Sequence, residues 1–304
     1  MEDSTRSVST PATSLFYRGD ELLATTKVNK LDKNECVVGY SGALVRIVGV
    51  EAETIFESKS VGLLSGAALA SGDIAVGATH SEILVLSPDG NVQRTIPSGL
   101  QPSHPDYLVA GGTPEIVVVA SRGYSNAKSS RAEQYDTATW TQGKSLAFTS
   151  VSRLSVSARG IARSTEKGYA NVDSWGLQEY RWKGGLKVIK TPTQRSSWCV
   201  ATASGWLVSD SNTAAFVDLG GAVRWTIAES HVGACALSDA RLAIVTFKAL
   251  VVVDVADGRV VETHPLKLGD KESFALPCSV AASPSGTVAF TSQTRILIVE
   301  RRAS

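Results

Sequence analysis

Short apolar runs separated by turn residues dominate the hydrophobic pattern of the chain. The stretch "CALSDARLAIVTFKALVVVDVADGRVVET", residues 235–263, shows the arrangement clearly. A strand of small residues is followed by a tight turn, a second β-rich strand, a short polar loop and a third strand rich in valine. A glycine-containing turn then leads to a fourth, more polar strand. Runs of this length are typical of strands, and Gly and Asp supply the positive φ angles that tight hairpins need.

This arrangement recurs at a measurable period. The glycines of the turn after the third strand align at Gly90, Gly221 and Gly258. The last two are 37 residues apart, and the first two are 131 residues apart, which fits three steps averaging about 44 residues. A four-stranded unit that recurs every ~40–45 residues is the sequence signature of a β-propeller.

Longer loops in the less regular segments extend the repeat to seven units. The seventh is short, and the segment "SLFYRGD", residues 14–20, precedes the first. We predict that residues 14–20 supply the outer strand of the last blade and close the ring, because an open array would leave unpaired edge groups. The predicted fold is all-β, a seven-bladed propeller of four-stranded antiparallel blades over residues 14–304, after a disordered polar tail at 1–13. The units begin near residues 21, 63, 106, 151, 196, 232 and 277.

The spacing and the hairpins "FVDLGGAVRWTI" and "VVVDVADGRVV" resemble seven-bladed propellers of the WD40 and quinoprotein-like kind. The resemblance spans residues 14–304 at the level of the fold. The GH and WD dipeptides that mark WD40 repeats are absent, and only Trp225 stands where quinoprotein enzymes carry a docking tryptophan. The resemblance therefore implies an architecture and does not assign an activity.

Asp254 and Asp257 form a candidate pair of catalytic carboxylates. Asp218 occupies the position of Asp254 in the preceding unit. A carboxylate that recurs with the repeat is expected to cap a hairpin turn.

Composition excludes several classes of protein. The net charge is +1, which gives no global argument for binding nucleic acid or membranes. The apolar runs are too short to span a bilayer, and the polar N-terminal stretch lacks the apolar region of a secretory signal. No two of the four cysteines form a C-x-x-C pair, so we expect reduced, buried thiols and no metal site or cofactor. We expect a cytoplasmic protein that is monomeric by itself.

In a propeller, the loops after the second strands and the connections between blades lie on one face. No single chemistry repeats around this ring, and the converging ligands that a metal centre needs are missing. The sequence contains no G-x-S-x-G elbow and no phosphate-binding loop. An enzyme or small-molecule binder at the mouth of the central channel is one alternative, with His80, His104, His231, Asp210 and Lys248 as its candidate residues.

Positive charge is concentrated in residues 122–195. This stretch holds thirteen Lys/Arg and five Asp/Glu, a local net charge of +8 against −7 for the rest of the chain, with aromatic residues interleaved. Such a sector can bind an acidic or phosphorylated protein segment or single-stranded nucleic acid, although outer propeller strands are also normally charged. The candidate partner-binding residues are Arg122, Tyr124, Lys128, Arg131 and Trp175, with Arg122, Lys128 and Arg131 predicted in one long Gly/Ser-rich loop.

The lack of a catalytic constellation favours a non-catalytic protein-interaction scaffold or a subunit of a larger assembly. Its partners would bind through the loops of one propeller face. RNA binding through the basic sector and chemistry at the channel mouth are the two alternatives.

Overall fold

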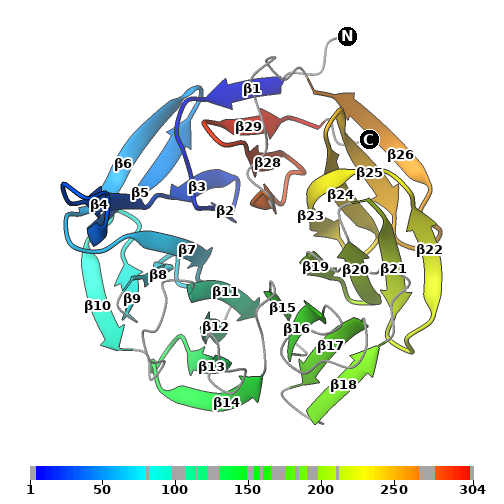
Figure 1. The fold of residues 1–304 in the computed structure, drawn as a ribbon, viewed down its shortest axis with the longest axis horizontal. Coiled ribbons are helices and arrows are strands. Elements are labelled where there is room, and N and C mark those ends of the chain that lie inside the picture. The colour runs from blue at the N-terminus through cyan, green and yellow to red at the C-terminus, as the bar shows by residue number, and fades with distance from the viewer. Residues whose placement is uncertain are drawn as a thin grey trace.

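The computed structural model describes residues 5–79, 82–97, 107–113, 116–121, 130–148, 154–157, 160–165, 176–181, 185–189, 198–209, 212–266 and 278–301. Seven antiparallel sheets surround a common centre (Figure 1). The innermost strand of each sheet contacts the innermost strands of both neighbouring sheets, so the contacts run around the whole ring. The predicted all-β propeller is confirmed, and the described ranges contain no helix and hence none long and apolar enough to cross a membrane.

Each blade runs from its innermost strand at the centre to its outermost strand at the rim. Blade 1 contains β2 (Ser14–Arg18), β3 (Glu21–Thr25), β5 (Val37–Val48) and β6 (Glu51–Ser58), and blade 2 contains β7 (Leu63–Ala68), β8 (Ile74–Ala78), β9 (Glu82–Leu86) and β10 (Val92–Pro97). Blade 3 contains β11 (Tyr107–Thr113), β12 (Ile116–Ser121), β13 (Ser130–Asp136) and β14 (Gln142–Phe148), and blade 4 contains β15 (Leu154–Ser157), β16 (Gly160–Thr165), β17 (Gly176–Arg181) and β18 (Gly185–Ile189). Blade 5 contains β19 (Trp198–Ala201), β20 (Gly205–Ser209), β21 (Ala214–Asp218) and β22 (Val223–Ile227), and blade 6 contains β23 (His231–Ser238), β24 (Arg241–Thr246), β25 (Ala249–Asp254) and β26 (Val260–Pro265). Blade 7 contains β27 (Val280–Ala282), β28 (Val288–Thr291), β29 (Ile296–Val299) and, as its outer strand, β1 (Thr5–Val8).

The strand that closes the ring differs from the predicted one. β1 pairs antiparallel with β29, so an N-terminal strand does complete the last blade. Residues 14–20 do not provide it, because Ser14–Arg18 is the innermost strand of blade 1. The predicted disordered tail at residues 1–13 is also wrong for residues 5–8. The reason is that "SLFYR" buries two large apolar side chains and suits the core, whereas "TRSV" buries only Val8 and suits a rim strand.

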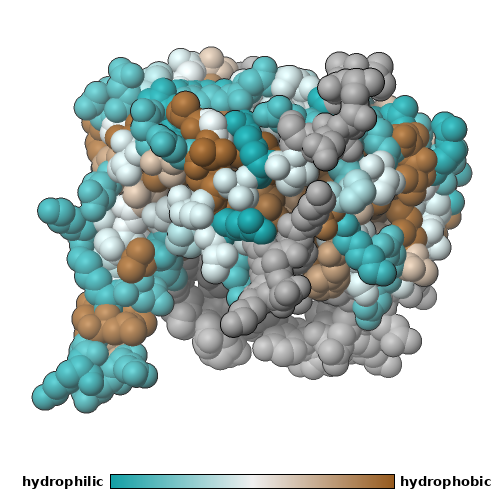
Figure 2. Space-filling view, turned by 90° about the horizontal axis from the view of Figure 1, so that it is seen from above, coloured by the Kyte–Doolittle hydropathy of each residue, from teal (hydrophilic) through white to brown (hydrophobic). Residues whose placement is uncertain are grey.

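Blade 1 carries an insertion between its second and third strands, where blades 6 and 7 have connections of two and four residues. The chain leaves β3, forms β4 (Val28–Leu31), turns, and returns through the first half of β5, which pairs with β4. We call residues 28–41 the arm. Figure 2 shows the arm projecting at the left, with a hydrophobic band next to a hydrophilic tip. The predicted start of the first repeat unit, near residue 21, is one strand too late, because the innermost strand of blade 1 begins at Ser14.

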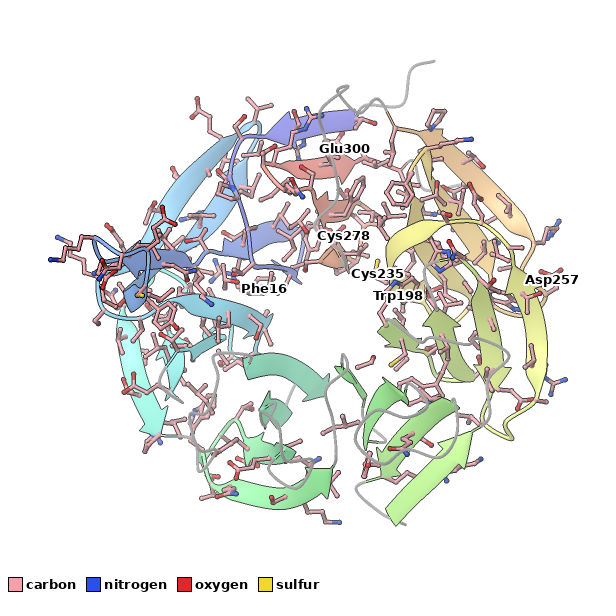
Figure 3. The ribbon with its side chains drawn as sticks, viewed as in Figure 1. Phe16, Trp198, Cys235, Asp257, Cys278 and Glu300 are labelled. Atoms are coloured by element: carbon pink, nitrogen blue, oxygen red, sulfur yellow. The ribbon has the colours of Figure 1, made fainter. Side chains whose placement is uncertain are left out.

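The aspartates after the third strands cap turns, as predicted. Asp254 Oδ1 accepts the backbone N–H of Ala256 at 2.9 Å, and Asp257 Oδ1 accepts that of Arg259 at 3.0 Å. Gly258, which lies between Asp257 and Arg259, has a positive φ of 74°. Figure 3 shows Asp257 at the outer rim of the ring, remote from the central channel. The two carboxylates stabilise a hairpin and do not form a catalytic pair.

Candidate functional site

The connections that could line the channel mouth belong to one face of the ring. Because the strands alternate in direction within each blade, the second-to-third connections and the connections between blades emerge on the same side. We call this side the entry face. Its fully described connections are residues 9–13, 26–36, 59–62, 228–230, 247–248 and 292–295.

A hydroxyl group marks the entry-face end of every second strand. Those with described side chains in blades 1, 2, 5, 6 and 7 are at most 3% exposed. The repeat of this residue type was visible in the sequence but was not recognised as a signal. The seven residues are Thr25, Thr79, Ser121, Thr165, Ser209, Thr246 and Thr291.

These buried hydroxyls satisfy backbone groups. Thr79 Oγ1 accepts the N–H of Gly62 at 3.0 Å, and Thr291 Oγ1 accepts the N–H of Ser279 at 2.9 Å. Gly62 and Ser279 each directly precede the innermost strand of the same blade. Because a buried N–H without a partner is costly, these two hydroxyls fix the point at which the chain enters blades 2 and 7.

Blades 5 and 6 vary this arrangement with a serine–histidine pair. The hydroxyl of Ser209 is hydrogen-bonded to Nε2 of His231, the first residue of β23. Nδ1 of His231 lies 2.5 Å from the carbonyl oxygen of Glu229. A carbonyl can only accept, so Nδ1 carries a proton and donates it to the Glu229 carbonyl. A serine bonded to an oriented histidine is also the geometry of an activated nucleophile.

Burial excludes that chemistry from this pair in the folded state. Ser209 is 0% exposed and His231 is 1% exposed, so a substrate carbonyl cannot reach the hydroxyl. The His231 ring meets the ring of Trp198 edge-on, with the centroids 5.2 Å apart, and Trp198 packs in the core that blades 5 and 6 share. The prediction that His231 lies open at the channel mouth is wrong, because its ring is held between two blades. The pair joins blade 5 to blade 6.

Phe247 and Lys248 form the exposed part of the entry face in blade 6. They make up the two-residue loop between β24 and β25, and Phe247 is 46% exposed. Thr246 Oγ1 accepts the backbone N–H groups of Lys248 and Ala249 at 3.2 and 2.9 Å, and the carbonyl of Lys248 accepts the N–H of Leu266 at 2.8 Å. The loop therefore presents an aromatic and a cationic side chain from a fixed backbone.

Most of the other candidate residues lie outside the described part of the chain. Arg131 does not lie in a loop as predicted, because it belongs to β13, where it pairs with Ser121 and Ala147. The long loop between β12 and β13 is shorter at its C-terminal end than the sequence suggested. The candidates outside the described residues are His80, His104, Asp210, Arg122, Tyr124, Lys128 and Trp175.

The cysteines are free thiols. Burial raises the pKa of the Cys199 and Cys235 thiols to about 12, so both are protonated at neutral pH. Cys199 and Cys278 are buried and Cys235 is half-buried, whereas Cys36 is exposed in the turn of the arm, which corrects the expectation for that residue. Within the described ranges, no three His, Cys, Asp or Glu residues gather in a group able to hold a metal ion.

Comparison with known proteins adds information on the fold alone. No protein-family model and no curated protein sequence matches the chain. Among solved structures, the chain is similar to one titled "Crystal structure of WD40 beta propeller domain of Doa1", with a TM-score of 0.69 and 10% identity, covering 99% of this chain and 97% of that one. It is also similar to "Streptogramin B lyase structure", with a TM-score of 0.63 and 11% identity, covering 98% of this chain and 97% of that one. A WD40 domain and a lyase thus share this architecture, and the chain resembles WD40-type propellers at the level of the fold.

Proposed function

We propose that this protein is a scaffold that binds protein partners through its entry face. The observation that carries the proposal is the contrast within blade 6. His231, the group best suited to chemistry, is buried and fully hydrogen-bonded, while Phe247 and Lys248 stand exposed on a backbone held by Thr246.

A fixed, exposed aromatic residue beside a cation suits protein binding. Aromatic side chains are enriched at the centres of protein interfaces, where they fill pockets on the partner. A preorganised loop loses little conformational entropy on binding, so more of the contact energy becomes affinity. Arg122 and Lys128, predicted in the corresponding loop of blade 3, would extend this surface with positive charge and favour an acidic or phosphorylated partner.

Affinity purification from the native cell, with quantitative mass spectrometry, tests the proposal. The double variant Phe247→Ala/Lys248→Ala is compared with Leu219→Ala, which removes a 37% exposed apolar side chain from a turn on the opposite face. We expect the double variant to lose proteins that the wild type and Leu219→Ala retain. An identical set of captured proteins for all three would contradict the proposal.

The basic sector has its own variant. Arg122→Glu/Lys128→Glu is expected to weaken capture of the same proteins. The nucleic-acid alternative predicts binding to single-stranded RNA at low salt that weakens steeply as the salt concentration rises. Loss of that binding in this variant would favour the alternative.

A further inference from the structure

The arm is the feature of the described chain that the propeller architecture does not require. Its apolar side chains are unusually open to solvent, with Val28 at 57%, Leu31 at 55%, Val37 at 46% and Val38 at 66% exposure. The arm is the connection between the second and third strands of blade 1, so it projects from the entry face.

The root of the arm is firmly built. Thr26 and Ala43 exchange hydrogen bonds, with Thr26 N–H bound to the Ala43 carbonyl and Ala43 N–H bound to Thr26 Oγ1, both at 2.8 Å. The Thr26 carbonyl also accepts the N–H of Leu63 from blade 2 at 3.1 Å. A Cβ atom at Gly42 would lie 2.5 Å from both Leu63 N and Thr26 O, so only glycine fits there. Two blades therefore hold the arm in place.

The turn of the arm is equally well formed. Asp32 Oδ1 accepts the backbone N–H groups of Asn34 at 2.8 Å and Cys36 at 2.9 Å. The Asp32 carboxylate is thus occupied within the turn. The arm is a specified hairpin with both ends hydrogen-bonded.

The β4 edge of this hairpin is unguarded. Among the described residues β4 pairs only with β5, so its outer backbone groups have no strand beside them. Lysine commonly blocks such edges, and Lys30 is the only charged residue of β4. Its side chain lies against Gly39 on the neighbouring strand and its Nζ donates to the Lys59 carbonyl, so it leans across β5 and away from the free edge.

We propose that the free edge of β4 docks an extended acidic segment of a protein partner, which adds to the arm as a third strand. This inference rests on the proposed scaffold function and names the kind of partner. A two-stranded ribbon is marginal in water, and a third strand would satisfy the outer backbone groups and cover Val28 and Leu31. The segment 27–35 carries three lysines, Lys27, Lys30 and Lys33, against Asp32 and Glu35, and the Asp32 carboxylate is occupied within the turn. Acidic side chains between apolar ones therefore complement the excess positive charge of the arm.

A second copy of this chain is the rival occupant of the same edge, and two of its registers are unfavourable. Paired side chains must lie on one face of a sheet, so a twofold pairing of two β4 strands centres on a single residue. Centred on Lys30, the pairing sets two lysines opposite each other. Centred on Asn29, it sets Val28 opposite the other copy's Lys30 and gathers Lys27 and Lys30 of both copies, and like charges at these distances repel.

Selection of phage-displayed random 12-residue peptides on the full chain tests the inference. We expect the enriched peptides to alternate apolar and acidic residues. We expect them to bind Val28→Asp at least about tenfold more weakly than the wild type, because the variant adds a negative charge and removes an apolar contact. Val92→Asp is the matched control, since Val92 is 49% exposed at the start of an outer strand in blade 2. Equal binding to both variants, or enriched peptides without acidic residues, would overturn the inference.

Three further outcomes separate this inference from its rivals. If light scattering detects a dimer and Val28→Asp dissociates it, the arm serves self-association and the inference is overturned. Single-stranded RNA binding that Lys30→Glu abolishes and Arg94→Glu leaves intact would assign the arm to nucleic acid and likewise overturn it. Protein partners that depend on Phe247 and Lys248 but persist with Val28→Asp would refute the arm inference and leave the proposed scaffold function standing.

Discussion

Gly258 shows how one residue joins two blades. A Cβ atom there would lie 2.6 Å from the ring of Trp225, which is on the outer strand of blade 5, and the indole Nε1 of Trp225 donates to the Val255 carbonyl at 2.8 Å. The turn of blade 6 therefore packs against the Trp225 side chain of blade 5 and accepts its hydrogen bond. Gly90 has the same relation to Ile55 of blade 1, whose carbonyl oxygen would lie 2.2 Å from an added Cβ.

Gly258→Ala is expected to lower the free energy of unfolding by about 2–4 kcal/mol, because it adds backbone strain at a positive φ to a clash with Trp225. Gly19→Ala is the control. Its φ of 58° is also positive, but nothing lies within 4 Å of the added methyl, so the cost is about 1–2 kcal/mol. Urea unfolding measures both, and equal losses would show that the Trp225 contact adds nothing.

Glu262 contributes a pH-dependent contact between the last two blades. Its carboxylate takes two hydrogen bonds from the Arg301 guanidinium, at 2.9 and 2.6 Å, and these bonds, together with one from His264, hold its pKa below the usual range. A lowered pKa in the folded state means that the stabilisation is complete above the ordinary pKa of about 4.3 and is lost as the pH falls through the folded pKa.

Glu262→Gln is therefore expected to lower the free energy of unfolding by about 1–2 kcal/mol at pH 7 and by progressively less below pH ~4. Glu51→Gln, an exposed carboxylate in β6, is the control. Unfolding curves between pH 7 and pH 3 measure the difference from the wild type. A penalty that stays constant across this range would contradict the role of the ionised carboxylate.

At the scale of elements, the arm is separable from the propeller core. Every residue from 28 to 38 is exposed, and residues 39–41 are half-buried. Replacing residues 28–41 with a short Gly/Asn turn keeps the Thr26–Ala43 contacts and removes no buried apolar side chain. We expect the melting temperature to change by less than about 2 °C.

Gly42→Ala is the contrasting change, because it disturbs the root that contacts blade 2. We expect it to lower the free energy of unfolding by about 1–3 kcal/mol, because the single added methyl group overpacks the site. Thermal unfolding compares the two proteins. A large loss on arm replacement would show that the arm serves the fold itself.

At the scale of the whole molecule, the ring depends on β1. Val8 is 2% exposed and packs in a core with Ile296 and Ile298 of blade 7. Removing residues 1–9 would leave β29 as an unpaired apolar edge. We expect a fall in melting temperature of more than about 5 °C with aggregation, whereas removing residues 1–4 is expected to have little effect. Equal melting temperatures for the two truncated proteins would contradict this closure.

The sequence revealed the architecture because the repeat is periodic. The turn glycines and apolar third strands recur at similar spacing, so the blade boundaries after the first followed from alignment. The closing strand could not be predicted, because "TRSV" has one apolar residue and no strong strand signal, and its pairing is with residues nearly 300 positions away. The role of His231 was equally hidden, since burial between two blades is a property of packing and leaves no local pattern.

Binding of partners to the entry face of the closed ring can be tested by hydrogen–deuterium exchange of the full chain, with and without a captured protein partner. We expect new protection in the arm (residues 28–41) and in the loop at residues 247–248, with none in the turns at residues 218–222 and 254–259 on the opposite face. Protection confined to those opposite turns would contradict it.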